Sequence, residues 1–421
     1  MDHFNLSNGA LHAESVALEE IADAVGTPVY VYSHATLERH VRVFREAVAG
    51  AGTGDPLIAF AVKANPNGAV LTTMAKAGMG ADVVSAGELL RALAAGILPE
   101  DIIFSGVGKT REEMALALSH RIGQFNLESE PEADMLSQIA SDMGIQAPVA
   151  YRVNPDVDAG THAKISTGKS ENKFGIPIDT APAAYARAAA LPGLKVQGVA
   201  VHIGSQLTDL APLETAFAKV GALVTALRAA GHAITLADLG GGLGVPYDPA
   251  QPLPPSPAAY GEMVRRVTAG WDVRLAFEPG RLIVANAGIL LSRVIRVKAG
   301  ASDPWVIVDA AMNDLLRPSL YDAWHDIRAV RPSGRSAPAN IVGPVCETGD
   351  TFALARPMET VAANDLIVFM TAGAYGATMA STYNSRALAP EVMVSGDQWA
   401  IVRPRQPLEA LLDAETVPDW V

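Results

Sequence analysis

The chain has 421 residues, of which 49% are apolar and 18% charged, so it can bury a large core and does not have the composition of a disordered protein. Lys and Arg total 32 against 45 Asp and Glu, a net charge of −13 without any basic block, which disfavours nucleic acid as a partner. No apolar stretch approaches the ~20 residues of a membrane helix, so we expect no membrane span.

The cysteine content bears on both compartment and chemistry. Cys346 is the only cysteine, which excludes an intrachain disulfide, and the N-terminus lacks the basic start and apolar run of a secretory signal. We therefore expect a cytoplasmic protein. Cys346 precedes Glu347 in a turn-rich stretch, residues 343–350 (GPVCETGD), where a small buried side chain and a functional thiol are both consistent with the position.

Strand and helix patterns alternate through the first two thirds of the chain. Residues 28–32 (PVYVY) predict a strand, and residues 34–49 predict a helix that leads into the next domain. Short apolar runs then alternate with Ala-rich helical stretches, the pattern of a parallel sheet. The runs predict eight strands, at residues 57–62, 80–85, 101–105, 124–127, 149–153, 196–202, 234–239 and 274–278. Eight such β/α units close a (β/α)8 TIM barrel.

Beyond Arg281 the sequence becomes rich in β-type segments separated by Gly, Pro and Asp turns. The predicted strands are residues 292–297, 305–308, 339–342, 366–370, 391–394 and 399–402. They indicate a second, C-terminal and mostly antiparallel β domain. The predicted fold class is therefore α/β, with the barrel over residues 30–280 and the β domain formed by residues 1–29 and 281–421.

The carboxyl ends of the strands form the active-site face of such a barrel. Lys63 follows the first strand in residues 60–67 (FAVKANPN), where burial on the barrel floor would desolvate the amine and make it a nucleophile able to form a Schiff base. A solvated loop lysine is the alternative for this residue taken alone.

Glycines and an acid-base pair follow the last two barrel strands. Gly240, Gly241 and Gly242 follow the seventh strand, where backbone amides can approach a phosphate closely, although a tight turn has the same composition. The eighth strand ends in residues 277–281 (FEPGR). Glu278 is placed to pair with a protonated ring nitrogen and Arg281 with a phosphate or carboxylate, unless the two pair with each other.

The sixth strand delivers His202 and Ser205, in residues 202–206 (HIGSQ). The imidazole can stack on a flat ring and the hydroxyl can reach a phosphate, although a histidine at a strand end is often structural. Together with Lys63, the glycines and Glu278, these residues indicate a pyridoxal phosphate site. We expect no metal, since the sequence lacks a paired-histidine motif and one cysteine cannot form a zinc cluster.

Ten segments carry a resemblance to a known family. They are residues 60–65 (FAVKAN), 82–89 (DVVSAGEL), 125–129 (FNLES), 152–174 (RVNPDVDAGTHAKISTGKSENKF), 202–206 (HIGSQ), 238–242 (DLGGG), 278–281 (EPGR), 312–321 (MNDLLRPSLY), 343–350 (GPVCETGD) and 373–375 (GAY). In this order, along nearly the whole chain, they resemble the diaminopimelate decarboxylases. The resemblance implies an alanine racemase-like fold, pyridoxal 5'-phosphate as cofactor, and decarboxylation of meso-diaminopimelate to L-lysine and CO2, the last step of lysine biosynthesis.

The resemblance also assigns residues to roles. The implied cofactor-binding residues are Lys63, His202, Ser205, Gly240, Gly241, Gly242, Glu278, Gly280, Arg281 and Tyr375; the substrate-binding residues are Arg281, Arg317, Tyr321, Glu347 and Tyr375; and the catalytic residues are Lys63, His202, Glu278 and Cys346. The family works as a head-to-tail homodimer in which Cys346 and Glu347 reach the partner's site, so the β domain would supply substrate and dimer contacts. Phe60 and Trp324 depart slightly from the usual pattern without removing a polar group of known role.

These roles predict a mechanism. Glu278 would keep the pyridine nitrogen protonated, and Cys346 would donate a proton to the carbanion left by CO2 loss. Glu347 would pair with the distal ammonium of the substrate, while Arg281 and Arg317 would bind carboxylates. We expect residues 160–173, which are rich in small polar side chains, to close over the substrate.

Three alternatives stay open at this point. An ornithine- or arginine-type decarboxylase of the same fold would lack a distal carboxylate on its substrate; Glu347 next to Cys346, with Arg317 upstream, favours diaminopimelate. A non-catalytic pyridoxal phosphate-binding barrel would not need the ~140 residues after Arg281. Amino-acid racemisation needs two bases on opposite faces of the α-carbon, which Lys63 and Cys346 do not exclude.

Overall fold

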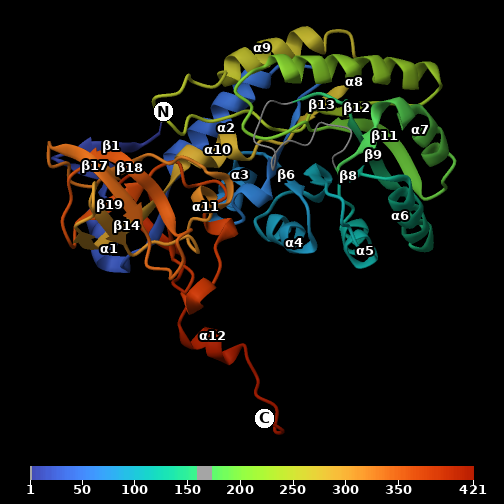
Figure 1. The fold of residues 1–421 in the computed structure, drawn as a ribbon. Coiled ribbons are helices and arrows are strands. Elements are labelled where there is room, and N and C mark those ends of the chain that lie inside the picture. The colour runs from blue at the N-terminus through green and yellow to red at the C-terminus, as the bar shows by residue number, and fades with distance from the viewer. Residues whose placement is uncertain (1, 159–172) are drawn as a thin grey trace. The chain divides into compact units, whose positions relative to one another are not determined.

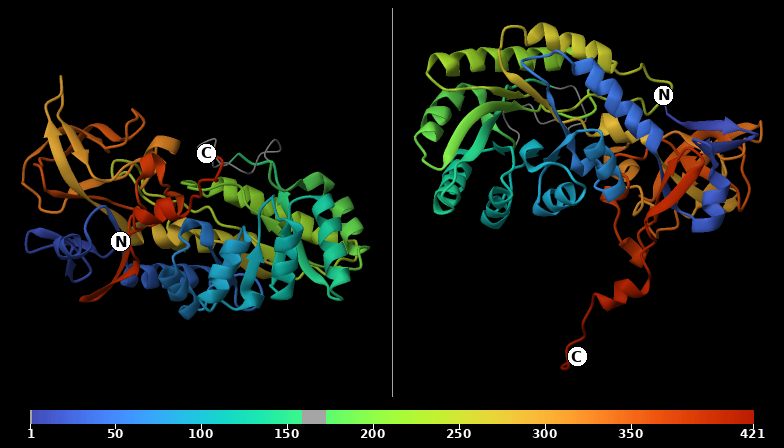
Figure 2. Two further views of the ribbon diagram at one scale, coloured as in Figure 1. Left: turned by 90° about the horizontal axis from the view of Figure 1, so that it is seen from below. Right: turned by 180° about the vertical axis from the view of Figure 1, so that it is seen from behind.

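The computed structural model describes residues 2–158 and 173–421, and the chain separates into two compact units (Figures 1 and 2). The first unit comprises Met1–Leu37, Pro246–Pro252 and Ile283–Val421. The second comprises Glu38–Val245 and Leu253–Leu282. Among the described residues, no helix is both long enough and apolar enough to span a membrane.

The second unit is built on a closed barrel of parallel strands. They are β5 (Leu57–Ala61), β6 (Gly80–Val83), β7 (Ile102–Phe104), β8 (Gln124–Leu127), β9 (Ala147–Asn154), β11 (Leu194–Val201), β12 (Leu236–Asp238) and β13 (Arg274–Phe277). Each strand pairs with the next along the chain, and β13 pairs with β5, which closes the sheet. A short strand, β10 (Ile176–Pro177), pairs in parallel with β9. All eight predicted barrel strands and the (β/α)8 fold class are confirmed.

Burial explains why these segments form strands. Every residue of β5, β6, β7 and β8 is buried, as expected for parallel strands that are covered on both faces. Helices lie outside the sheet (Figures 1 and 2). They are α2 (His34–Val48), α3 (Gly68–Lys76), α4 (Ala86–Ala94), α5 (Arg111–Ser119), α6 (Glu130–Asp142), α7 (Ala181–Ala189), α8 (Ala211–Ala229) and α9 (Pro257–Val267).

Helix starts follow from local capping chemistry. Thr110 accepts a hydrogen bond from the Glu113 backbone N–H, and the Glu113 side chain accepts one from the Thr110 N–H, so α5 begins with a complete capping box. Ser129 caps α6 by accepting from the Glu132 N–H, with Pro131 in the first turn. Both helices thus begin where a capping side chain is followed by acidic residues in the first turn.

The first unit contains a mixed sheet in which antiparallel pairs predominate. Its strands run in the order β18 (Thr351–Glu359), β17 (Ser336–Val342), β15 (Trp305–Val308), β14 (Gly288–Lys298), β4 (Val29–Ser33), β20 (Glu391–Ser395) and β21 (Gln398–Arg403). The pairs β15 with β17 and β20 with β4 are parallel. Two further strands, β16 (Ile327–Ala329) and β19 (Leu366–Phe369), pair with each other, and β19 also pairs with β14.

An N-terminal three-stranded sheet completes this unit, formed by β1 (Phe4–Ser7), β2 (Ala10–Ala13) and β3 (Val16–Ala17). Its buried side chains Phe4, Leu11 and Val16 belong to the same apolar cluster as Ile289 of β14 and Val368 of β19. The helices of the unit are α1 (Leu18–Val25), α10 (Arg281–Val284), which starts at the unit boundary, α11 (Arg317–Tyr321) and α12 (Glu409–Asp413). The N-terminal segment therefore shares a core with strands that lie more than 270 residues later in the chain.

Candidate active site

Lys63 lies at the carboxyl end of β5, in the short 3-10 turn Val62–Ala64. Its Nζ is 2.7 Å from Oδ2 of Asp82 on β6, a fully buried residue. The other oxygen, Oδ1, is buried without a hydrogen-bond partner among the described residues. The Lys63 side chain is 43% exposed, so the prediction that its amine is desolvated on the barrel floor is wrong. Strand β5 ends in a turn that carries the amine to the rim.

The three glycines after β12 form a loop that only glycine can build. Gly240 and Gly242 have φ angles of +65° and +116°. A Cβ on Gly241 would lie 2.2 Å from the backbone oxygen of Glu278, and one on Gly242 would lie 2.4 Å from that of Gly204. The loops after β11, β12 and β13 therefore pack backbone against backbone.

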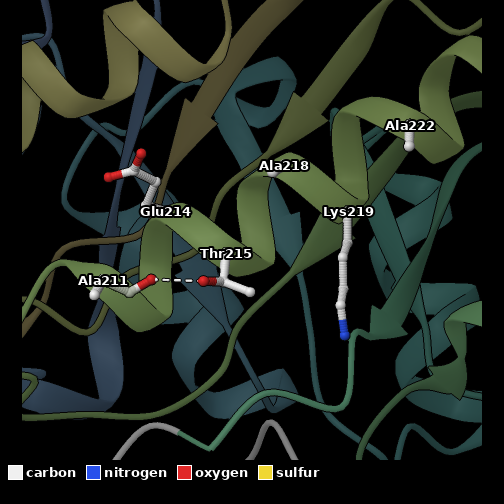
Figure 3. A pocket seen from close by; sticks show the side chains of 6 residues that line it. All are labelled: Ala211, Glu214, Thr215, Ala218, Lys219 and Ala222. Carbon is white, nitrogen blue, oxygen red and sulfur yellow. Dashed lines mark hydrogen bonds between the residues drawn. The ribbon is translucent and has the colours of Figure 1, made fainter.

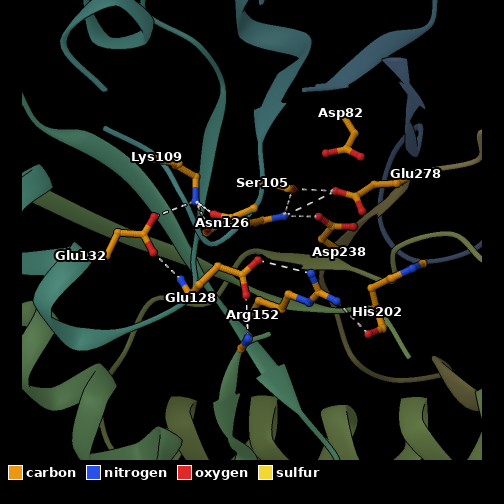
Figure 4. A network of polar contacts seen from close by, with 12 residues as sticks. Asp82, Ser105, Lys109, Asn126, Glu128, Glu132, Arg152, His202, Asp238 and Glu278 are labelled. Carbon is orange, nitrogen blue, oxygen red and sulfur yellow. Dashed lines mark hydrogen bonds and ion pairs between the residues drawn. The ribbon is translucent and has the colours of Figure 1, made fainter. Parts of the chain in front are cut away.

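Buried carboxyl groups gather beneath this loop (Figure 4). The Asn126 amide donates to Oδ2 of Asp238 at 2.9 Å and to Oε1 of Glu278 at 3.4 Å. Asp238 also accepts the Gly240 N–H at 2.9 Å. Burial raises the pKa of Glu278 well above its usual range, and the negative charges of Asp238 and Asp82 raise it further. Glu278 therefore binds a proton more readily than a solvent-exposed glutamate does.

His202 follows β11 and is held as a neutral ring. Its Nδ1 accepts the Gly241 N–H at 3.3 Å, which leaves the ring proton on Nε2. Desolvation lowers the pKa of His202 well below its usual value, and the positive charges of Arg152 and Lys63 act in the same direction. Arg152 donates to the His202 backbone oxygen at 3.2 Å and pairs with Glu128 at 3.2 Å (Figure 4).

Arg281 and Ser205 lie together at the same rim. The Arg281 guanidinium is almost fully buried and donates to Ser205 Oγ at 3.1 Å. Gly280 permits the close approach of this turn to the one that carries Lys63, since a Cβ there would lie 3.0 Å from the Ala61 Cβ. Lys63, His202, the glycine loop, Glu278 and Arg281 thus share the carboxyl-end face of the barrel.

The remaining predicted residues belong to the first unit. Cys346 and Glu347 are exposed in the turn between β17 and β18. Asp350 holds this turn by accepting the N–H groups of Met312 and Val345, each at 2.7 Å. Exposure excludes the interpretation of Cys346 as a small buried residue in the single chain.

Arg317 and Tyr321 lie in α11. Arg317 is buried, donates to Nε2 of His325 at 2.9 Å, and lies over the Tyr247 ring at 4.4 Å. Ser319 donates to the Gly349 oxygen at 2.7 Å, which ties α11 to the turn that carries Cys346. Tyr375 follows β19 with a φ of +57°. The cysteine, the glutamate and the two α11 residues are thus parts of one local arrangement.

Comparison with known proteins identifies the family of this chain. The family model described as the pyridoxal binding domain of pyridoxal-dependent decarboxylases matches residues 34–285. The chain is 58% identical to the diaminopimelate decarboxylase of Zymomonas mobilis over 418 residues, which covers 99% of each chain. The chain belongs to the diaminopimelate decarboxylase family.

Solved structures of diaminopimelate decarboxylases have the same fold. The enzyme from Helicobacter pylori complexed with L-lysine is 40% identical, with a TM-score of 0.90 over 94% of this chain and 98% of that chain. The enzyme from M. jannaschii in co-complex with L-lysine is 34% identical, with a TM-score of 0.94 over 99% of this chain and 98% of that chain. The match to this family thus extends over both units.

Several residues that the structure brings into these contacts had no predicted role. Asp82 and Asp238 are carboxylates within otherwise apolar strands, a signal that could have marked them. Asn126, Arg152 and Tyr383 gave no such signal, because each has a partner far away in the sequence: Glu278 is 152 residues from Asn126, His202 is 50 from Arg152 and Glu347 is 36 from Tyr383. The predicted lid, residues 160–173, lies outside the described residues except for Lys173.

A shallow depression on the outer face of α8 is separate from these residues (Figure 3). It is lined by Ala211, Glu214, Thr215, Ala218, Lys219 and Ala222. Lys219 donates to the Pro155 oxygen at 2.6 Å, and Glu214 pairs with Arg266 at 2.5 Å. Its polar groups already have partners, and no predicted site residue lines it.

Proposed function

We propose that this member of the diaminopimelate decarboxylase family is a pyridoxal phosphate-dependent carboxy-lyase that converts meso-diaminopimelate to L-lysine and CO2. The observation that carries the proposal is the placement of Lys63, the glycine loop and the buried Glu278 on one face of the barrel. The names of full-length relatives and the L-lysine complexes of two structural neighbours support the choice of substrate over ornithine or arginine.

The barrel residues fit the cofactor. The glycine loop carries no side chains, since any Cβ would collide with neighbouring backbone, and this leaves room for a phosphate to approach; Ser205 and Arg281 add a hydroxyl and a cation. Glu278, whose pKa burial raises, is suited to share a proton with a pyridine nitrogen, and Asp82 offers a buried oxygen without a partner among the described residues beside Lys63. When bound, pyridoxal phosphate supplies an electron sink for the pair of electrons that CO2 leaves behind.

Each side chain then has a defined task. Lys63 holds the cofactor covalently, and Glu278 holds the proton at the ring nitrogen. His202, kept neutral by desolvation, stacks on the ring without adding a competing positive charge. Gly240, Gly241 and Gly242 would hold the phosphate, with Ser205 and Gly280 beside them.

The first unit would supply the acid and the substrate contacts. Cys346, an exposed thiol, donates the proton that replaces CO2 on the substrate carbon. Glu347 pairs with the distal ammonium, while Arg317, Tyr321 and Arg281 bind carboxylates. We propose that Cys346 and Glu347 serve the barrel of a second copy in a homodimer, which agrees with their exposure in the single chain.

Product analysis tests the activity. Purified protein loaded with pyridoxal phosphate is incubated with meso-diaminopimelate, and CO2 and L-lysine are measured; no cofactor-dependent product would overturn the proposal. L-lysine as sole product, without stereoisomers of the substrate, distinguishes decarboxylation from racemisation.

Subunit mixing tests the shared site. Lys63→Ala and Cys346→Ala are each expected to be inactive, and mixed dimers should regain activity at the one site that has both residues intact. About a quarter of the wild-type activity is expected for equal, randomly mixed subunits. No recovery, with exchange of subunits verified, would mean that each chain completes its own site.

A further inference from the structure

Tyr383 makes a contact with Glu347 that the proposed mechanism does not use. Its hydroxyl donates to Oε2 of Glu347 at 2.8 Å, across 36 residues of sequence. The Tyr383 residue is 47% exposed, so packing of its ring contributes little to the core. The other carboxylate oxygen, Oε1, lies over Gly349, where a Cβ would come within 2.9 Å of it. The hydroxyl therefore holds the Glu347 carboxylate against its own turn.

One short segment anchors both partners. The Met312 N–H donates to Asp350, which holds the turn of Glu347. The next residue, Asn313, donates to the Ser381 oxygen at 3.2 Å and accepts from Arg386 at 2.9 Å, on either side of Tyr383. Two adjacent residues, through the Met312 backbone and the Asn313 side chain, thus tie the turn of Glu347 and the loop of Tyr383 to the same short segment.

The chemistry of the pair suits a cation-binding carboxylate. A glutamate on an exposed turn otherwise samples several rotamers, and ordering it on binding costs affinity. A phenol restricts those rotamers through one hydrogen bond and, being neutral, leaves the negative charge available, whereas a lysine or arginine in its place would neutralise it. Beside Glu347, the Tyr383 hydroxyl has its pKa raised, first by this hydrogen bond and then by the carboxylate charge, so it stays a donor.

We propose that Tyr383 is a positioning residue that orients Glu347 toward the distal ammonium of the substrate and so sets specificity for a ligand that carries both an amine and a carboxylate at its far end. This inference rests on the proposed function, in which Glu347 forms an ion pair with that ammonium. It assigns to Tyr383 a role in recognition and none in proton transfer.

The test compares two ligands that differ only in the amine that Glu347 is proposed to bind. L-lysine carries the α-amine that corresponds to the distal amine of the substrate, and 6-aminohexanoate lacks it. Dissociation constants of both are measured by calorimetry on the cofactor-loaded protein, for wild type and Tyr383→Phe. The variant should bind L-lysine about tenfold more weakly, the value of one hydrogen bond to a charged group, and 6-aminohexanoate unchanged.

A double variant and a control variant test whether the effect comes from the Tyr383–Glu347 hydrogen bond. In a Glu347→Gln background, Tyr383→Phe should have no further effect on L-lysine binding, because the carboxylate that it orients is gone. Tyr151→Phe is the matched control: that hydroxyl is buried in the barrel without a partner among the described residues, and its loss should leave both dissociation constants unchanged. With meso-diaminopimelate, Tyr383→Phe should raise KM about tenfold and leave kcat within about twofold.

Equal weakening of both ligands, or an unchanged affinity for L-lysine, would overturn the role of Tyr383. A fall in kcat without a change in KM would place it with the proton donor Cys346 instead, and would also overturn it. Failure of the wild-type protein to release CO2 from meso-diaminopimelate would refute the proposed function itself, so the two failures are distinct.

Discussion

Replacing Asp314 by Asn should stabilise the protein relative to wild type, and this gain in the free energy of unfolding should be larger at neutral pH than in acid. Asp314 is 1% exposed, accepts the Ala311 N–H at 2.9 Å, and lies 3.6 Å from Arg386. Burial raises the pKa of Asp314 from 3.8 to about 6, against the opposing effects of the Ala311 hydrogen bond and Arg386. Asp314 directly follows Met312 and Asn313, which anchor the loops of Glu347 and Tyr383. Its ionisation in the folded state lowers the free energy of unfolding.

The sign of the effect follows from proton linkage. The folded state binds the Asp314 proton more tightly than the unfolded chain, so the stabilising contribution of protonation is present in acid and is lost as the pH rises through about 6. The cost of ionisation is about 1 kcal/mol at about pH 4.5 and about 3 kcal/mol at about pH 7, from a shift of roughly two units. Asparagine cannot ionise, so the variant escapes this cost.

Urea unfolding measured at both pH values by tryptophan fluorescence tests the prediction. Trp305, Trp324, Trp399 and Trp420 report on the unit that contains Asp314. The free energy of unfolding of the variant minus that of wild type should rise by about 2 kcal/mol from about pH 4.5 to about pH 7, whatever constant offset the amide introduces. Asp397→Asn, on an exposed turn, should show no such change. A difference for Asp314→Asn that does not vary with pH would refute the reasoning.

Three further changes probe the barrel. Glu278→Ala should lower turnover by several orders of magnitude in a CO2-release assay, because the ring nitrogen loses its proton partner, and near-normal turnover would contradict that role. Gly241→Ala should weaken pyridoxal phosphate binding at least about tenfold in a spectroscopic titration, since its Cβ would lie 2.2 Å from the Glu278 oxygen, whereas Gly108→Ala, with open space around it, should bind normally. Lys109 Nζ lies 2.6 Å from Oε1 of the buried Glu132, so Lys109→Met should cost about 3–5 kcal/mol in urea unfolding by leaving that carboxylate without its cation; a loss below about 1 kcal/mol would contradict this reasoning.

Local pattern was sufficient for most of the fold. The barrel strands were predictable because they are short, mainly apolar runs between helices, and this alternation is a property of neighbouring residues. Strand β18 was missed because residues 351–359 (TFALARPME) mix charged residues and a proline with exposed positions, as edge strands do. Strands β1 to β3 were missed because each has only two to four residues.

The candidate site likewise has features that the sequence predicted and features that it did not. Lys63, His202, the three glycines and Glu278 were predicted from the sequence because each directly follows a recognisable strand, and strand ends meet on one face of a barrel. The exposure of Lys63 was predicted wrongly, because the 3-10 turn after β5 and the pairing with Asp82 depend on the neighbouring strand.

The sequence by itself determined the alternation of strands and helices, the residues at the strand ends and the family, because these depend on the order of residues along the chain. Only the tertiary structure decided which groups meet: Asp82 with Lys63, Asn126 with Asp238 and Glu278, and Tyr383 with Glu347. Those contacts depend on strand order, register and loop anchoring, which bring distant residues to within hydrogen-bond reach. The same burial that creates the contacts shifts the pKa of Glu278 and His202, so the protonation states on which the proposed chemistry depends are properties of the folded chain.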